Sequence, residues 1–169
     1  DDNILSVIEP VAAKAQERLD QLEKLIKIGV KISVRCDPII HNITDNDDQL
    51  QDLFSAVSKA GCNEIAVSFL FLRPAIISSL KKNIVDAKLL DKILEPFSEG
   101  VNLSIGLKNS TGKMLPLEVR KASIENIRKI AGNYGIQIHI CGCKNSDITN
   151  ESCYITREQQ NFQGSLFSD

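Results

Sequence analysis

The sequence predicts an α/β fold in which about four parallel strands alternate with helices, as in half of a TIM-type barrel. The first observation is a set of short apolar segments rich in β-branched residues, which is typical of strands buried on both faces. These segments are 30–40, 64–72, 101–107 and 136–141. The second observation is that the stretches between them carry apolar residues at helical spacing.

Residues 11–28 illustrate the helical pattern. Their apolar positions lie three or four residues apart, at Ala15, Leu19, Leu22 and Ile26. Gly29 follows, where the end of a helix favours a positive φ. The other predicted helices are 45–61, 74–84, 87–97 and 116–134. Because strands and helices alternate, we expect right-handed crossovers and therefore parallel strands.

The number of strand–helix units also predicts the domain organisation. Four units amount to half of an eight-unit barrel, which typically needs about 250 residues. With 169 residues, we expect either an open doubly wound sheet or a segment that begins just after a strand of a longer protein. Residues 1–143 are expected to form the half barrel. Residues 144–169, where periodicity is lost, are expected to form a cysteine-containing loop and a polar tail.

Composition excludes several classes of function. The net charge of −2 gives no overall attraction to nucleic acid phosphates. No apolar run approaches the roughly 20 residues that cross a bilayer, and no basic leader opens the chain, so we expect a cytoplasmic protein without a membrane partner. Phosphate-loop, dinucleotide-binding, nucleophile-elbow and HExxH motifs are absent. Hydrolase, kinase and dehydrogenase functions therefore have no support.

Cysteines gather at the end of the last predicted strand. They are Cys141, Cys143 and Cys153, out of five in the chain, an odd number that argues against a secreted disulfide framework. Three soft ligands here predict an auxiliary iron–sulfur cluster or a zinc ion, and candidates for a fourth ligand are His139, Asp147, Cys62 or a residue from a missing half of the barrel. The alternative is that Cys141 is a small buried hydrophobe and the other two are ordinary loop thiols.

The segment 8–46 carries a pattern in which several features agree in order and spacing. The matching residues are Glu9-Pro10, Arg18-Leu19, Leu25, Gly29, Arg35 and Asp37-Pro38-Ile39-Ile40. This pattern resembles a segment of the spore photoproduct lyase-like radical S-adenosylmethionine proteins. The resemblance is best over residues 4–75 and looser over 116–155, where the run Cys-Gly-Cys-Lys-Asn (141–145) also matches.

The resemblance implies that residues 1–143 are the C-terminal half of a radical S-adenosylmethionine barrel. In that family a C-x3-C-x2-C loop in the first half holds a [4Fe-4S] cluster, which reduces S-adenosylmethionine to release a 5′-deoxyadenosyl radical. That loop is absent here. The segment would then supply barrel wall and contacts to cofactor and substrate, with no catalytic residue of its own, and the missing half would be its partner. The isolated segment is expected to be inactive.

The resemblance also implies the residues that contact the cofactor. Arg18, Arg35, Asp37 and Ser68 are the candidates, because barrel active sites form at the C-terminal ends of the strands. A guanidinium binds a carboxylate, and a carboxylate accepts from an ammonium or from ribose hydroxyls. The alternatives are that Arg35 and Asp37, which share one side of a strand, pair with each other, and that Arg18 forms a surface salt bridge.

Other functions stay open at this point. A second hypothesis is a stand-alone small α/β module that binds zinc or an iron–sulfur cluster, or a partner, through Cys141, Cys143 and Cys153. A third is a nucleic-acid-binding domain, against which the acidic balance argues. The substrate, a small molecule or a nucleic acid, is not specified. We also expect the exposed edge of the first strand to form a homodimer or to be covered by a terminal segment.

Overall fold

The computed structural model describes residues 6–105 and 110–150. Its helices are α2 (Ala15–Lys27), α3 (Asp47–Lys59), α4 (Pro74–Asn83), α5 (Ala87–Leu94), the short 3₁₀ helix η1 (Glu95–Phe97) and α6 (Leu117–Gly132). Its strands are β1 (Val34–Ile39), β2 (Glu64–Phe69), β3 (Val101–Ile105), β4 (Ser110–Met114) and β5 (Gln137–Ile140). Within this part of the chain, every helix is too short or too polar to cross a membrane.

Three of the predicted strands form a parallel sheet in the order β1-β2-β5. Val34 of β1 pairs with Ile65 of β2, which in turn pairs with Ile138 of β5. The β1–β2 register shifts between Cys36 and Ile39, where Pro38 has no N–H to donate to the ladder. The chain is therefore α/β, with parallel strands alternating with helices as predicted.

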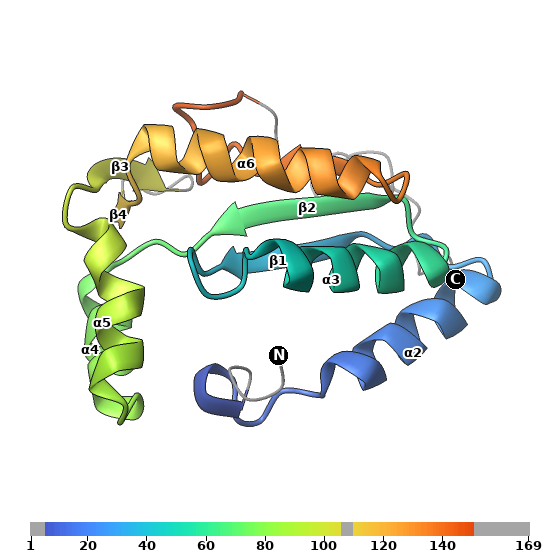
Figure 1. The fold of residues 1–169 in the computed structure, drawn as a ribbon, viewed down its shortest axis with the longest axis horizontal. Helices are drawn as coiled ribbons and strands as arrows, with labels where there is room; N and C mark the ends of the chain where they lie inside the picture. The colour runs from blue at the N-terminus through green and yellow to red at the C-terminus, as the bar shows by residue number, and fades with distance from the viewer. Residues whose placement is uncertain (1–5, 106–109, 151–169) are drawn as a thin grey trace, which may run out of the picture.

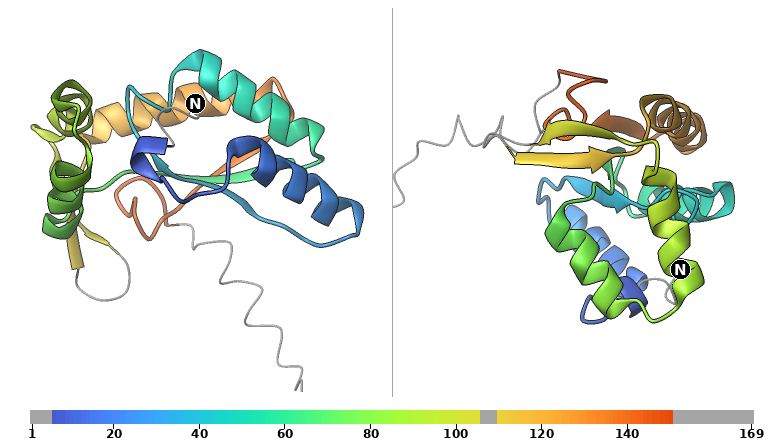
Figure 2. Two further views of the ribbon diagram at one scale, coloured as in Figure 1. Left: turned by 90° about the horizontal axis from the view of Figure 1, so that it is seen from below. Right: turned by 90° about the vertical axis from the view of Figure 1, so that its left-hand side faces the viewer.

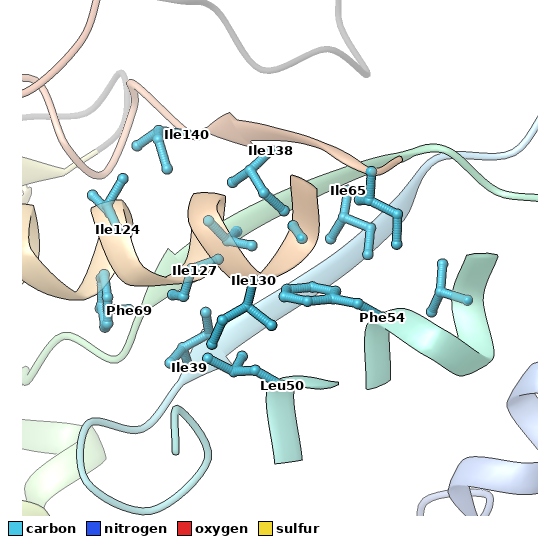
Figure 3. Close-up of a cluster of buried hydrophobic side chains, with 14 of the residues drawn as sticks. Ile39, Leu50, Phe54, Ile65, Phe69, Ile124, Ile127, Ile130, Ile138 and Ile140 are labelled. Carbon is cyan, nitrogen blue, oxygen red and sulfur yellow. The ribbon is translucent and has the colours of Figure 1, made fainter. Parts of the chain in front are cut away.

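Helices α3 and α6 lie side by side on one face of this sheet (Figure 2, left). Between them and the strands lies a core of aliphatic side chains and aromatic rings, among them Phe54 of α3, which is 1% exposed (Figure 3). The strands contribute alternate residues to this core, among them Ile65, Val67 and Phe69 of β2. The residues between these positions consequently face the opposite side of the sheet.

The predicted parallel pairing of strand 101–107 is wrong. Its described part, β3, pairs antiparallel with β4 in a separate two-stranded sheet. Only four residues, 106–109, separate the two strands, and a parallel connection needs a dozen or more. Leu72, just after β2, forms an antiparallel bridge with Lys113 of β4, so the hairpin is joined to the end of β2.

Helices α4 and α5 stand beyond the C-terminal ends of β1 and β2 (Figure 1, left). No residue of α4 is buried, whereas α6 buries Ile124, Ile127 and Ile130. α6 is therefore the crossover helix that covers the sheet between β2 and β5. α4, α5 and the hairpin form an insertion at the C-terminal end of the strands.

Several local predictions are confirmed. Gly29, Gly61 and Gly135 follow α2, α3 and α6 with φ of 81°, 90° and 68°, the left-handed values that suit glycine at helix ends. Asn46 caps α3, because its side chain accepts from the N–H of Gln49 at 3.0 Å. Pro74 occupies the first turn of α4.

Residues 144–150, directly after the predicted boundary of the half barrel, pack against α6. Arg120 of α6 is fully buried and donates to Asp147 at 2.9 Å and to the side chain of Asn145 at 3.2 Å. Its Nε donates to the carbonyl of Leu115 at 3.0 Å. Hydrogen bonding to Arg120 holds the pKa of Asp147 below its usual value. This ion pair fixes the loop that follows β5.

We predict that Asp147→Asn destabilises the protein by about 2–3 kcal/mol at pH 7, because the buried Arg120 loses its counter-charge while Asp147 is 23% exposed. Because the pKa of Asp147 is lower in the folded protein, the ionised carboxylate stabilises the folded state at pH values above the ordinary carboxyl pKa. This stabilisation is lost as the pH falls through the pKa of Asp147 in the folded protein. Urea unfolding at pH 7 and below pH 4 measures the difference in unfolding free energy between the parent and Asp147→Asn. This difference should be smaller in acid. Asp52→Asn, on the exposed face of α3, is the control.

Candidate functional site

The side of the sheet that faces away from α3 and α6 carries polar residues from all three strands. Ser68 lies between the core residues Val67 and Phe69, and Arg35 pairs through Ala66 with His139. We call this side the polar face, and its members are Arg35, Asp37, Glu64, Ser68, His139 and Cys141. Because the strands are parallel, the C-terminal ends of β1 and β5 bring Asp37 and Cys141 to the same end of the sheet.

Asp37 is the centre of this end of the polar face. Both of its carboxylate oxygens accept from Lys144 Nζ at 2.7 Å, and one accepts from Arg35 at 3.0 Å. The side chains are largely buried, at 16% exposed for Asp37, 20% for Lys144 and 26% for Arg35. The predicted pairing of Arg35 with Asp37 is therefore present, within a larger cluster.

Ser68, the predicted contact from β2, is 1% exposed. Its Oγ has no hydrogen-bond partner among the residues that the structure describes. A buried hydroxyl without a partner carries a desolvation penalty of about 1–3 kcal/mol, so its position calls for a ligand or a bound water. The neighbours of Ser68 on β2, Val67 and Phe69, pair with Cys36 and Ile39 of β1. Ser68 forms no hydrogen bond to Asp37.

Three residues of this region were not among the sequence candidates: Lys144, Phe71 and Arg73. The Arg73 guanidinium lies 4.9 Å from the centre of the Phe71 ring, and Lys144 Nζ lies 5.4 Å from the same centre. These are distances at which a cation is attracted by an aromatic ring. Lys144 and Arg73 each follow a strand of the parallel sheet, a signal that could have indicated them.

Arg18 lies apart from the Asp37 cluster. Its guanidinium pairs with Glu9 at 3.0 Å and its Nε donates to the carbonyl of Ala13 at 2.9 Å, with side chains about half exposed. Arg18 nevertheless lines the same cavity as Arg35 and Asp37, a space of about 960 Å³ between α2 and β1. The ion pair of Arg18 with Glu9 agrees with the alternative prediction that Arg18 forms a surface salt bridge.

Two of the three predicted metal ligands meet after β5. The Sγ atoms of Cys141 and Cys143 are 2.7 Å apart, with Cys141 buried and Cys143 exposed. Cys153 lies outside the described residues. Within residues 6–105 and 110–150, no three His, Cys, Asp or Glu side chains gather closely enough to hold a metal ion.

A serine, a histidine and an aspartate also meet at the N-terminal end of α3. His41 Nδ1 lies 2.7 Å from Asp45 Oδ2 and 3.4 Å from Ser123 Oγ. Both partners contact the same ring nitrogen, whereas a catalytic triad needs the base and the orienting carboxylate on opposite nitrogens. This cluster therefore joins the loop before α3 to α6 and is not a nucleophilic site.

We predict that Cys36 is unreactive in the folded protein. Burial raises the pKa of its thiol to about 11, with a further contribution from the neighbouring Asp37, so at pH 8 almost no thiolate forms. Pulse labelling with iodoacetamide should modify the exposed Cys143 first, and Cys36 at least about a hundredfold more slowly than in denaturant. Equal labelling of Cys36 in both states, measured by peptide mass spectrometry, would contradict the burial.

No family model matches this chain, and no curated protein or solved structure matches it. Its site is therefore interpreted from its own geometry.

Proposed function

We propose that this chain is part of a larger parallel barrel of the radical S-adenosylmethionine kind, similar to spore photoproduct lyase, and that it contributes wall and ligand contacts. The observation that carries this proposal is the cavity of about 960 Å³ between α2 and the free edge of β1. Among the described residues β1 pairs only with β2, so its other edge is available to a further strand.

The topology of α2 and β1 supports a strand in that cavity. When a helix precedes a parallel strand, the strand before the helix commonly pairs beside the strand after it. The cavity lies in that position, with α2 facing the free edge of β1 (Figure 1). Its lining is mainly apolar and includes Leu19, Leu22, Leu25, Ile32 and Val34. Such a lining suits a strand that is buried on both faces.

The Asp37 cluster fits the polar groups of S-adenosylmethionine. Asp37 can accept from its ammonium or ribose hydroxyls, and Arg35 or Lys144 can donate to its carboxylate. Ser68 Oγ offers a further donor that has no partner now. When bound with its cluster, this cofactor would supply radical chemistry. The residues of this chain would orient it at the C-terminal end of the sheet, where barrel enzymes hold their ligands.

The [4Fe-4S] cluster itself does not fit this chain. The sequence holds no C-x3-C-x2-C run, and no three-cysteine group occurs among the described residues. The cluster ligands would therefore come from the partner half of the barrel. The enzyme activity, like the cluster, would belong to the whole barrel.

The proposal predicts a C-x3-C-x2-C motif in the coding sequence, about 100 or more residues before Asp1, the length of the missing half. In the full-length protein, Asp37→Asn should weaken S-adenosylmethionine binding at least about tenfold, since a hydrogen bond to a charged group is worth roughly 1.5–3 kcal/mol. Isothermal titration calorimetry measures this effect.

Asp52→Asn removes an exposed carboxylate from α3 and should leave that binding unchanged. An upstream sequence without the motif would overturn the proposal. So would an Asp37→Asn protein that binds the cofactor as tightly as the parent.

A second candidate function is metal binding by the loop after β5. The proximity of the Cys141 and Cys143 thiols favours it, because two soft ligands already lie near each other after β5. A zinc ion or an auxiliary iron–sulfur cluster would need further ligands, and Cys153 is the sequence candidate.

Metal analysis of this chain, purified without oxygen, separates the two functions. The metal-binding module predicts about one zinc per chain, or bound iron for a cluster, with loss of the metal in Cys143→Ser. Cys36→Ser is the matched control, because Cys36 is not a candidate ligand and its side chain packs against the core. Absence of metal in the parent chain would contradict this second function.

A further inference from the structure

The loop after β5 places two thiols of unequal exposure near each other. Cys141 is buried, Cys143 is exposed, and their Sγ atoms lie close together. Gly142, the residue between them, has no Cβ, so the chain can turn there and bring both side chains to one side. An accessible thiol beside a buried one is the arrangement in which an attacking cysteine has a resolving cysteine next to it.

Hydrogen bonds of the backbone hold the turn that carries these thiols. The carbonyl of Cys141 accepts from the backbone N–H of Lys144 and from the side chain of Asn145, both at 3.1 Å. The backbone N–H of Asn145 donates to the carbonyl of Gly142 at 3.2 Å. Asn145 is 1% exposed, so these bonds are shielded from water. The proximity of the two thiols therefore follows from the shape of the turn.

Both sides of the turn are attached to the rest of the fold. The side chain of Asn145 accepts from Arg120 of α6 at 3.2 Å, and Arg120 is fully buried. Lys144 Nζ donates to both carboxylate oxygens of Asp37 on β1 at 2.7 Å. These contacts do not involve the thiols, so they orient the pair before any reaction. Such orientation raises the effective concentration of one thiol at the other.

A bond between the two sulfur atoms would close a small ring across a single residue. A disulfide forced out of its preferred geometry is strained, and strained disulfides are the ones that are readily reduced again. The pair is therefore suited to reversible exchange and not to a permanent cross-link.

We infer that Cys141 and Cys143 form a thiol–disulfide exchange site whose substrate is an accessible disulfide, such as that of oxidised glutathione. Cys143 loses its proton to solvent and attacks one sulfur of the substrate, whose S–S bond breaks, and the other half leaves and takes up a proton. Cys141 then loses its proton, attacks the sulfur of Cys143 and releases the second half in the same way. The chain gives up two electrons, and one substrate disulfide becomes two thiols.

This reaction needs neither a metal ion nor S-adenosylmethionine, so the inference goes beyond both proposed functions. Zinc or iron retained before treatment with a chelator bears on the second proposed function alone. The exchange is therefore measured on the reduced chain after removal of metal.

Equilibration of this chain with glutathione buffers of defined ratio tests the site. Trypsin cleaves after Lys129 and Lys144. Both thiols therefore lie on one peptide and Cys153 lies on the next, so mass spectrometry after acid quenching and alkylation distinguishes the possible disulfides. We expect an internal disulfide in the first peptide that reduced glutathione reverses. Its equilibrium constant should be at least about tenfold higher in the folded chain than in urea, because the turn orients the thiols.

Three variants assign the roles. Cys141→Ser should stop the reaction at a mixed disulfide between Cys143 and glutathione, since the resolving thiol is absent. Cys143→Ser should leave this peptide reduced, because Cys141 is buried. Asn145→Ala should lower the equilibrium constant about three- to tenfold, the effect of one hydrogen bond to the turn. Cys36→Ser is the matched control and should leave the constant unchanged.

A disulfide that joins Cys143 to Cys153 in place of Cys141 would overturn the site. So would an equilibrium constant that is the same in the folded chain and in urea. Circular dichroism checks that each variant remains folded. If Asn145→Ala unfolds, Cys141→Ser still tests the site, because a chain that forms no mixed disulfide at Cys143 would also contradict it.

Discussion

The carboxylate of Asp37 is the interaction on which the end of the sheet depends. It accepts from Lys144 at 2.7 Å through both oxygens and from Arg35 at 3.0 Å, and so joins β1 to the loop after β5 across β2. The two partners are 107 residues apart in sequence. Without this carboxylate, two largely buried cations would face each other at close range, which is strongly unfavourable away from water.

The carboxylate of Asp37 also determines which cations near the polar face already have an anionic partner. Lys144 and Arg35 already donate to Asp37, whereas the buried Nε of Arg73 has no acceptor among the described residues. A ligand with a cationic group would compete with Lys144 and Arg35 for Asp37. Phe71 lies between Lys144 and Arg73 in the contact network, because both cations approach its ring.

Much of the sheet was predictable because β-branched runs and helical spacing are local signals. β1, β2 and β5 lie within predicted strands, and Asn46 and Gly61 flank α3 as expected. The antiparallel β3–β4 pair was missed because the apolar pattern of β3 does not specify the direction of its partner strand. That direction follows from the four-residue connection between β3 and β4, which is too short for a parallel pair. Arg73 and Lys144 were missed because their meeting at Phe71 depends on where their loops fold and not on spacing within either segment.

The free edge of β1 connects the fold with the proposed barrel. Unpaired backbone groups at a sheet edge recruit further strands, and proteins usually cover them. Here α2 lies over that edge without filling the space, and the cavity reaches from Leu22 and Leu25 to Arg35 and Asp37. A strand inserted there would pack against the apolar side of α2. Arg35 and Asp37 would then lie near the C-terminal end of β1, beside the inserted strand. The Asp37 cluster would then be enclosed on that side of the sheet.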